Sequence, residues 1–552
     1  CGTPEEKYSP NRLNSSGTTD IFANQADTYE DSPIEKVDLA YSYQDLFDNY
    51  IYQADNIPLK GDKDPRILVI PVWFKDSDEF LNDDNKESVR NDIKNSFFGN
   101  IEDVGWRSVA GYYKQESFNK FNLTGTVSEW YECNKSYKDF ASNDVATSQK
   151  NTSDLVKDAY NWFKSGNTDY RDFDSDKDGY IDAIALIYAC PDYDSYSRVN
   201  NNRSPFSRGE RKSLGTNMWA YSFWEQDSNN NKNEPIVNSY LWASYDFMYD
   251  KNYPKNGLYG YGDTNYCKID THTFIHETGH LLGLQDYYDY GTTYGAYGAY
   301  SAAGYFSMQD NNVGGHDPYS KIALGWNKPY VIDNSFEGDS ITINIRPNQE
   351  TGDVILITPE FNNSPFDEYL LIELYTPTGL NQFDSTYPYL GNAQYKGSAE
   401  SGIRLWHVDA RLTYPSGKSN GKYTFNSDNI TVNPTQKTTY GKQHATSNTT
   451  TCSDTDGYCS DVPGFENYRL LQLIRRNKNN SSCGDYFTKK DLFVTGDSFS
   501  TRDYNRIFVE REFNLFAINP SKCYLNSGKD FNFNISFDSV SAELATVTIT
   551  KI

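Results

Sequence analysis

The sequence lacks the long apolar segments from which membrane-spanning helices are built. Such a helix needs about 20 consecutive apolar residues, whereas the longest apolar runs of this chain, such as residues 184–190, have only the length of a β-strand. We therefore expect no segment of the chain to cross a bilayer.

Positive charge is also scarce. The 552 residues include 51 Lys and Arg but 76 Asp and Glu, which gives a net charge of −25 at pH 7. A field of this sign repels phosphate backbones, so we expect no nucleic-acid partner. The acidic excess suits a soluble protein that meets calcium outside the cell, although solubility alone explains it equally well.

Cysteine is rare too, with 8 residues in the chain. A chain of this length can bury enough apolar surface to fold without disulfides. It begins at Cys1, which precedes a polar stretch too poor in apolar residues to pack. This start is similar to that of processed bacterial lipoproteins, in which the N-terminal cysteine carries the lipid. We expect lipidation of Cys1 to be the only link to a membrane; the alternative is that the sequence starts at an arbitrary point.

The other cysteines allow some disulfides. If Cys1 carries a lipid, an odd number of cysteines is left, so at least one thiol stays unpaired. Cys452 and Cys459 bracket a short loop rich in Ser, Asp and Gly and are the first candidate pair, and Cys483 with Cys523 is the second. Both pairings stay open.

The chain divides into three regions. Residues 1–60 are polar and acidic and predict a flexible tether or linker. In residues 61–330, buried strands alternate with amphipathic helices, which favours a mixed sheet with at least one parallel pair. Residues 331–552 contain short β-rich runs, which predict a sandwich-like region with a polar insertion at 413–460. The expected fold class is therefore α+β.

The strongest signal for chemistry is the segment 271–290, THTFIHETGHLLGLQDYYDY. His276 and His280 are four residues apart, so on a helix both imidazoles project from one face, as two ligands of a tetrahedral zinc require. Glu277 is offset from this direction and can take a proton from zinc-bound water as the general base. The segment therefore predicts an active-site helix with a zinc ion.

A third ligand is expected from the residues that follow this helix. Gly283 lets the chain turn through a left-handed conformation, so that Asp286 can reach the metal and complete the pattern HExxHxxGxxD. Three protein ligands leave the fourth zinc position open for water. Asp289 competes for the role of third ligand, and His272 is expected to be a helix-entry residue or a neighbour of the ligands. The alternative for the whole segment is a chance match on an amphipathic helix.

The stretch HETGHLLGLQD resembles the zinc motif of the metzincin peptidases, with Asp in place of the commoner third His. Metzincins share a methionine-containing turn beneath the metal, and the resemblance implies this role for Met308 in GYFSMQDN; core packing is the alternative. Many metzincins have a tyrosine two residues after this methionine, where it helps to stabilise the transition state. Here that position is Asp310, which leaves Tyr305 and Tyr319 as nearby substitutes and the stabilising residue open.

The wider sequence is more similar to the immune-inhibitor-A-type metallopeptidases of bacteria than to other metzincin families. The similarity spans roughly residues 60–500 and includes ILVIPVWF, SVAGYYKQESFNKFNLTGTVSEWY, DFDSDKDGYIDAIALIYA, NMWAYSFW, GHDPYSKIALGW, EYLLIELY, GIRLWHVDAR and ENYRLLQLIRRN. The resemblance implies a metzincin-like zinc metallopeptidase domain over residues 61–330, followed by the β-rich region.

A second candidate cation site is an Asp-rich turn. Its pattern is DxDxDGxxD, formed by Asp174, Asp176, Asp178, Gly179 and Asp182. Alternating carboxylates around a turn suit calcium, a hard cation that takes six or more oxygen ligands. Position twelve of an EF-hand would be Ala185 rather than Glu, so the turn is not an EF-hand. The alternative is a solvated acidic turn without an ion.

The other histidines carry weaker signals. His407 and Asp409 alternate on a predicted strand, where local packing is a commoner role than a second metal site or a catalytic dyad. His316 and Asp317 follow the methionine turn and could line the active-site cleft. His444 lies in the polar insertion and gives no signal.

Together these patterns predict a secreted or surface-anchored zinc endopeptidase, a monomer that binds protein or peptide substrates along a sheet edge. Zinc would lower the pKa of its bound water from about 15.7 towards about 7, and Glu277 would pass the released proton to the leaving amine. Two other classes stay open. One is an inactive surface-binding or adhesion protein on this scaffold, and the other is a zinc hydrolase that acts on something other than peptides.

Overall fold

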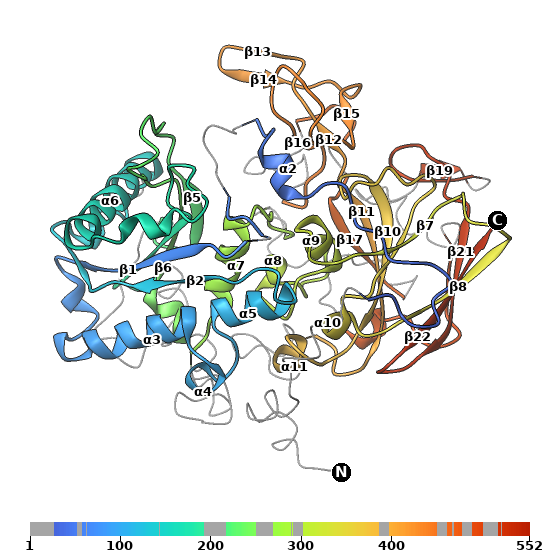
Figure 1. Cartoon of the computed structure of the whole chain (residues 1–552), viewed down its shortest axis with the longest axis horizontal. Helices are drawn as coiled ribbons and strands as arrows, with labels where there is room; N and C mark the ends of the chain where they lie inside the picture. The colour runs from blue at the N-terminus through green and yellow to red at the C-terminus, as the bar shows by residue number, and fades with distance from the viewer. Residues whose placement is uncertain are drawn as a thin grey trace.

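An α/β half and a β-rich half lie side by side in the computed structural model (Figure 1). Among the described residues, no helix is both long and apolar enough to span a membrane. The structure describes residues 27–51, 58–61, 63–142, 144–192, 217–249, 269–288, 290, 302–385, 397–449, 461–465, 468–476, 488–500, 517–519 and 522–552.

The α/β half is built on one six-stranded sheet. Its strands are β1 (Arg66–Phe74), β2 (Thr124–Val127), β3 (Tyr131–Cys133), β4 (Ala183–Tyr188), β5 (Tyr221–Trp224) and β6 (Ser239–Ser244). They follow the order β2-β1-β4-β6-β5, with β3 also paired to β1, and the pairs are parallel except for the antiparallel pair of β5 and β6. The prediction of a mixed sheet with parallel strands is confirmed.

Helices cover both faces of this sheet. On one face lie α3 (Lys86–Phe98), α5 (Val109–Glu116) and α7 (His272–Leu281), and on the other lies α6 (Val145–Gly166). The other helices of this half are α4 (Ile101–Val104), α8 (Met308–Asn311) and α9 (Pro318–Ala323). In β1, Ile67 and Val69 face a core shared with α3, α5 and α7, while Leu68 and Ile70 face a second core shared with α6. Burial on both faces explains why this strand is a continuous apolar run.

Apolar residues do not mark the start of helix α6. The helix begins at Val145, after the N-cap Asp144. Its first turns bury hydroxyl groups: Thr152 is fully buried and donates a 3.1 Å hydrogen bond to the carbonyl four residues before it. Buried hydroxyls leave no apolar pattern, so periodicity misses these turns.

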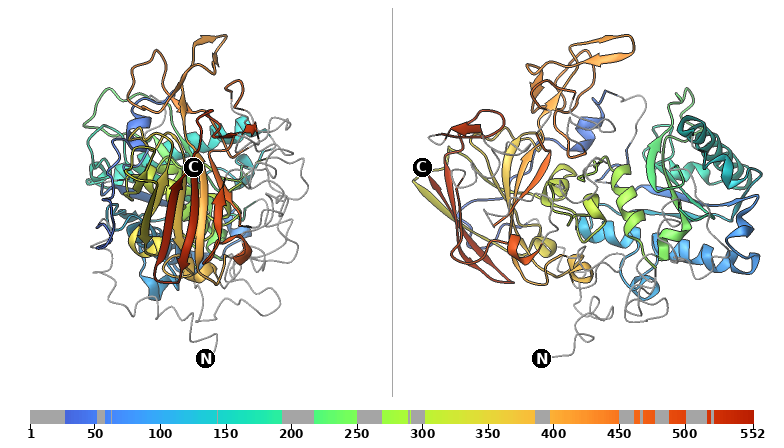
Figure 2. Two further views of the ribbon diagram at one scale, coloured as in Figure 1. Left: turned by 90° about the vertical axis from the view of Figure 1, so that its right-hand side faces the viewer. Right: turned by 180° about the vertical axis from the view of Figure 1, so that it is seen from behind.

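Two sheets form the β-rich half. The first has the order β17-β11-β10-β9-β7, with β7 (Tyr330–Ile332), β9 (Ile355–Ile357), β10 (Glu368–Tyr375), β11 (Gly402–Asp409) and β17 (Leu471–Ile474). The second has the order β18-β21-β22-β8, with β8 (Ser340–Ile345), β18 (Ser498–Ser500), β21 (Phe533–Val540) and β22 (Ala545–Lys551). They face each other (Figure 2) and contribute to one hydrophobic core. Smaller elements of this half are α10 (Asn348–Thr351), α11 (Asn381–Asp384), β19 (Ala517–Asn519) and β20 (Lys522–Tyr524).

The predicted polar insertion projects from the junction of the two halves (Figure 1). Its described strands are β12 (Leu412–Thr413), β13 (Gly417–Ser419), β14 (Lys422–Thr424), β15 (Ile430–Thr431) and β16 (Gln443–His444). Phe425 and Ala445 of the insertion form a hydrophobic cluster with Val462 and Phe465, which follow it in the chain. The insertion is therefore folded, and β16 leads back to the junction.

Residues 27–51 differ from the flexible tether predicted over residues 1–60. Lys36 forms a buried ion pair with Asp353, in which Nζ and Oδ1 are 2.6 Å apart, and its backbone pairs with that of Tyr330 in β7. These contacts could not be predicted from the sequence, because the segment is polar overall and its partners lie some 300 residues away.

The same segment then reaches the α/β half through α2 (Tyr43–Phe47). Tyr43, Leu46 and Phe47 are buried in the core that contains α7. Cys1 lies outside the described residues, as does at least one cysteine of each candidate disulfide pair.

Candidate metal centre

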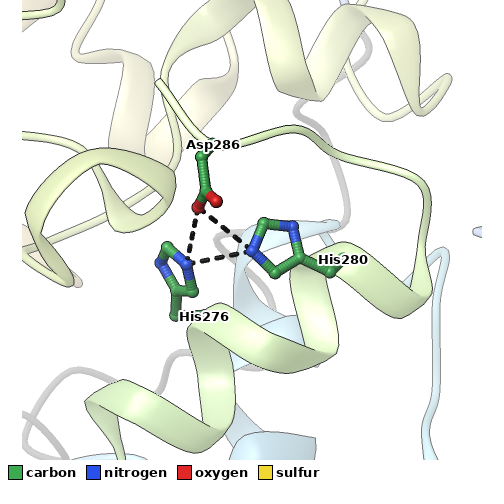
Figure 3. Close-up of side chains that lie close together, drawn as sticks. All are labelled: His276, His280 and Asp286. Carbon is green, nitrogen blue, oxygen red and sulfur yellow. Dashed lines mark hydrogen bonds and ion pairs between the residues drawn. The ribbon is translucent and has the colours of Figure 1, made fainter. Parts of the chain in front are cut away.

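Helix α7 presents the two predicted histidine ligands. Phe274 and Ile275 are buried in the core shared with α3 and α5, and Tyr113 of α5 donates a 2.6 Å hydrogen bond to the Ile275 carbonyl. This packing fixes the helix, so that His276 and His280 lie one turn apart and point in one direction (Figure 3).

The chain after α7 turns back and brings Asp286 to these histidines. Gly283 has a φ of +97°, the left-handed conformation that the sequence predicts and that glycine adopts without strain. Asp286 Oδ1 lies 2.9 Å from His276 Nε2 and 3.1 Å from His280 Nε2, and the two Nε2 atoms are 3.1 Å apart (Figure 3). Ligand atoms about 2.0 Å from a tetrahedral zinc lie about 3.3 Å apart. The ligand triangle formed by these three atoms therefore has the size of a zinc site.

Backbone carbonyls fix the orientation of both imidazoles. His276 Nδ1 lies 2.7 Å from the carbonyl oxygen of Met308, and His280 Nδ1 lies 2.8 Å from that of Leu284. A carbonyl oxygen only accepts hydrogen bonds, so each Nδ1 carries a proton and each Nε2 is left to face the triangle. Met308 thus contributes its backbone to the site, while its side chain is buried in the core.

The charges of the three groups in the triangle shift the pKa values of Asp286 and His280. Burial raises the pKa of Asp286, but the adjacent His280 and His276 outweigh burial and hold this pKa well below its ordinary value. Burial lowers the pKa of His280, but the attraction of Asp286 reverses this effect and raises the pKa to about 9. The buried carboxylate therefore requires positive charge beside it, which a protonated histidine or a metal cation can supply.

Glu277 lies next to the ligand triangle without belonging to it. Its side chain is buried, and burial raises its pKa against the opposing attraction of His280 and His276. Ser222 of β5 donates a 2.8 Å hydrogen bond to the Glu277 backbone carbonyl, and the same hydroxyl lies 3.4 Å from Oε2. Ser222 thus ties Glu277 to the edge strand of the sheet.

Among the described residues, the tyrosines that contact the triangle are not those that the sequence suggested. Tyr319 is buried in the core, where its hydroxyl contacts Tyr43 and His444. Tyr305 donates its backbone N–H to Asp310 over 2.6 Å.

Instead, Tyr290 donates its hydroxyl to Asp286 Oδ2. The ring of Tyr288 packs against that of His276, with centroids 6.3 Å apart. Sequence reasoning missed both tyrosines, although they stand within the same motif segment as the ligands.

His272 is not part of the triangle. Its Nδ1 lies 2.6 Å from Asp270 Oδ1 and its Nε2 lies 2.9 Å from Asp384 Oδ2, while Trp106 stacks on the imidazole at 4.2 Å. Since Asp384 belongs to α11, this contact joins the start of α7 to the β-rich half. The helix-entry role predicted for His272 agrees with this place. Asp289, the competing third ligand, lies outside the described residues.

The acidic turn brings three of its four predicted carboxylates together. Oxygen atoms of Asp174, Asp176 and Asp182 lie within 4.8 Å of one another. Burial raises the pKa of Asp182 to about 6, against the effect of a hydrogen bond from the Arg66 backbone. Asp178 accepts the Tyr180 N–H instead, and it lines a small cavity with Asp176, Asp182 and Lys60. Lys60 forms an ion pair with Asp176.

The other candidate residues have local roles. His407 Nε2 lies 2.8 Å from Glu368 Oε1, and Asp409 accepts hydrogen bonds from Nε and Nη2 of Arg411, at 2.8 and 2.9 Å. Neither belongs to a cluster of three potential metal ligands in the described part of the chain.

His316 and Asp317 are buried rather than aligned along a cleft, and Asp317 caps α9. His444, which gave no signal in the sequence, is also buried, and it lies beside Gln285.

The chain is similar to a known peptidase family over part of its length. Residues 59–191 match the immune inhibitor A peptidase M6 catalytic domain. No curated protein matches the chain. The family match confirms the resemblance to immune-inhibitor-A-type peptidases and supports a metallopeptidase, which acts on proteins or peptides. The matched segment includes β1 and the acidic turn but ends before α7, so the ligand triangle lies outside it.

Proposed function

We propose that this protein is a zinc-dependent endopeptidase with Glu277 as its general base. The observation that carries the proposal is the ligand triangle of His276, His280 and Asp286 beside a buried glutamate. The match over residues 59–191 supports the same function independently, because it rests on a segment that does not contain the triangle.

The residues of the triangle fit zinc. Two neutral imidazole nitrogens and one carboxylate oxygen are the ligand types of catalytic zinc sites, and three protein ligands leave a position for water or substrate. When bound, zinc would supply the Lewis acidity that lowers the pKa of a coordinated water and polarises the scissile carbonyl. Tyr290 and the Met308 carbonyl would hold two of the ligands in place.

Glu277 would carry the proton in this reaction. It accepts the proton of the attacking water and then donates it to the nitrogen of the leaving amine, as one carboxylate can do in both steps. Ser222, through its bond to the Glu277 backbone, keeps this side chain at the edge strand β5.

The peptide substrate would lie along β5. Among the described strands, β5 pairs only with β6, so no described strand occupies its other edge, where an extended peptide backbone would form hydrogen bonds. Phe223 of β5 is 40% exposed and offers an apolar surface to substrate side chains. Because Ser222 of this strand contacts Glu277, a peptide bound there would pass close to the general base.

The finer description of the fold and its surroundings follows from the resemblance. We regard the α/β half as metzincin-like, with Met308 as the methionine turn, and the β-rich half as sandwich-like. We further propose a monomer that is secreted or held at the cell surface.

The acidic turn is proposed as a calcium site that stabilises the α/β half. Calcium prefers oxygen ligands, and Asp174, Asp176 and Asp182 already lie close together. Backbone carbonyls and water would complete its coordination. Lys60 competes for Asp176 and would have to move aside.

Casein hydrolysis by the purified chain tests the proposed function, alongside Glu277→Gln and a zinc chelator. We expect Glu277→Gln to keep one zinc but lose turnover by a factor of about 100 or more, and we expect added zinc to restore the chelated parent. A parent that holds one zinc yet cleaves neither casein nor a library of extended peptides would favour the inactive binding protein. A parent without zinc would remove the basis of the proposal.

A further inference from the structure

Asp286, the third ligand, is held by a loop, whereas a helix holds the two histidine ligands. His276 and His280 stand on helix α7, whereas Asp286 belongs to a loop whose described residues are 284–288 and 290, called here the ligand loop. A metal site binds tightly only when each ligand is held within about 0.5 Å of its productive position. The affinity of the site therefore depends on what fixes the ligand loop.

A segment of the polar insertion, residues 443–449, holds the ligand loop just before Asp286. We call it the clamp segment. His444 Nδ1 lies 3.3 Å from Gln285 Nε2, which can only donate. His444 Nε2 then donates to the Tyr319 hydroxyl, 3.0 Å away. Burial lowers the pKa of His444 to about 4, so the imidazole is neutral at pH 7 and can accept from Gln285.

The clamp segment also holds the ligand loop just after Asp286. Asn448 Nδ2 donates a 3.1 Å hydrogen bond to the Tyr287 carbonyl, and the Thr449 carbonyl accepts a 2.5 Å hydrogen bond from the Tyr290 N–H. Contacts on both sides of Asp286 limit the movement of its backbone.

The β-rich half in turn holds the clamp segment. The Asn448 amide group exchanges two hydrogen bonds with the Leu471 backbone of β17, at 2.8 and 3.0 Å. Thr446 donates its hydroxyl to the Asp409 carbonyl at the end of β11, over 2.5 Å. Asn448 is 1% exposed, so few alternative partners are available to it. The sheet of the β-rich half is thereby connected to the third ligand through one side chain.

We propose that the clamp segment positions Asp286, with His444 and Asn448 as positioning residues, so that the β-rich half forms part of the metal centre. This inference rests on the proposed function because it concerns the same site. Loss of a partner that orients a metal ligand typically lowers metal affinity 10- to 100-fold. We therefore expect the clamp segment to control metal affinity even though none of its residues belongs to the triangle.

Metal binding by the full chain tests the proposal with two clamp variants. Asn448→Asp keeps the size of the side chain but removes both N–H donors. His444→Phe keeps an aromatic ring against Tyr43 and Phe366 but cannot accept from Gln285. Val547→Ala, in the core between the two β-sheets, is the matched control for loss of stability alone.

Two readouts separate positioning from stability. The zinc dissociation constant is measured by competition with a chelator, and the absorption spectrum of the Co²⁺ form reports the geometry of the ligands. We expect each clamp variant to bind zinc 10- to 100-fold more weakly than the parent and to change the Co²⁺ spectrum. Val547→Ala should lower the melting temperature but keep the parent's zinc affinity and spectrum.

The outcomes separate the inference from the proposed function. If the parent binds zinc and the clamp variants match it in affinity and spectrum, the inference is wrong while the proposed function stands. The inference is also wrong if Val547→Ala weakens zinc binding as much as they do, since stability alone would then explain the effect. If the parent binds zinc no better than His276→Ala, which lacks one ligand, zinc does not bind at the triangle. The inference and the proposed function would then both be wrong.

Discussion

The ring of Phe47 lies directly against Gly283, the glycine that ends the metal-binding helix. A Cβ atom added to Gly283 would be only 2.1 Å from Phe47 Cε2. Residues 27–51, which include Phe47, thus contact the turn that leads to Asp286. The same residues also form the Lys36–Asp353 ion pair with the β-rich half. The packing of Phe47 therefore affects the turn that places Asp286 in the metal centre.

Gly283→Ala should destabilise the protein through two effects. The left-handed backbone costs an alanine about 1–2 kcal/mol, and the overlap with Phe47 adds to this. Gly338→Ala is the matched control, because Gly338 has a similar φ of +86° with no atom within 4 Å of an added Cβ. In urea unfolding, Gly283→Ala should lose more stability than Gly338→Ala, and a Phe47→Ala background should remove the excess. Equal losses in the two glycine variants would show that the Phe47 contact is unimportant.

The Lys36–Asp353 ion pair predicts an asymmetry between its two partners. Lys36→Met leaves Asp353 with two hydrogen bonds from the Arg346 guanidinium, at 2.8 and 3.0 Å, so we expect a loss of about 1–3 kcal/mol. Asp353→Asn removes the carboxylate charge that pairs with buried Lys36 and should cost about 3–5 kcal/mol. Urea unfolding of both variants measures these free energies. If both variants lose less than about 0.5 kcal/mol of stability, as variants at ordinary surface positions do, the prediction that this segment is a flexible tether would be correct.

His444 predicts a loss of stability at acidic pH. Burial lowers its pKa to about 4 in the folded protein, whereas an unfolded histidine titrates near about 6.5. Between these values the unfolded chain binds a proton that the folded protein does not, so stability falls as the pH falls from about 6.5 to about 4. The difference of about 2.5 pKa units corresponds to about 3 kcal/mol. His444→Phe should lack this component, and parallel curves of unfolding free energy against pH for the two proteins would contradict the prediction.

The ligand triangle could be predicted from sequence because its geometry is local. His276, His280, Gly283 and Asp286 lie within one short segment, and the 3.6-residue period of a helix followed by a glycine turn is enough to place the three ligands. The mixed sheet was predictable for a similar reason, since each buried strand such as β1 is a continuous apolar run.

The supports of the triangle could not be predicted in this way. His444 is 159 residues from its partner Gln285, and Asp384 is 112 residues from His272. Nothing in the composition around His444 marks it as buried, because the stretch is rich in Thr, Asn and Ser. Its environment arises only when α2, α9 and the insertion meet, and such contacts leave no periodic pattern in a single sequence.

The acidic turn gives a prediction in which one substitution has opposite effects with and without calcium. Lys60 is the counter-charge of Asp176. Without calcium, Lys60→Met removes a partly exposed ion pair, and stability should fall by at most about 1 kcal/mol. With calcium, the same substitution removes a competitor for Asp176, so calcium should bind more tightly and stabilise the variant more than the parent.

Thermal unfolding in a calcium chelator and at increasing calcium concentrations measures both effects. Calcium at 100 times its dissociation constant should add about 2.7 kcal/mol to the stability of the parent, and Lys60→Met should reach the same gain at a lower concentration. Asp182→Asn removes one carboxylate charge from the cluster and should weaken the response, whereas Asp178→Asn, outside the cluster, should weaken it less. If calcium changes the stability of none of these proteins, the turn is an acidic loop whose cation is Lys60 itself, and the charge that a metal would supply is already provided by the chain.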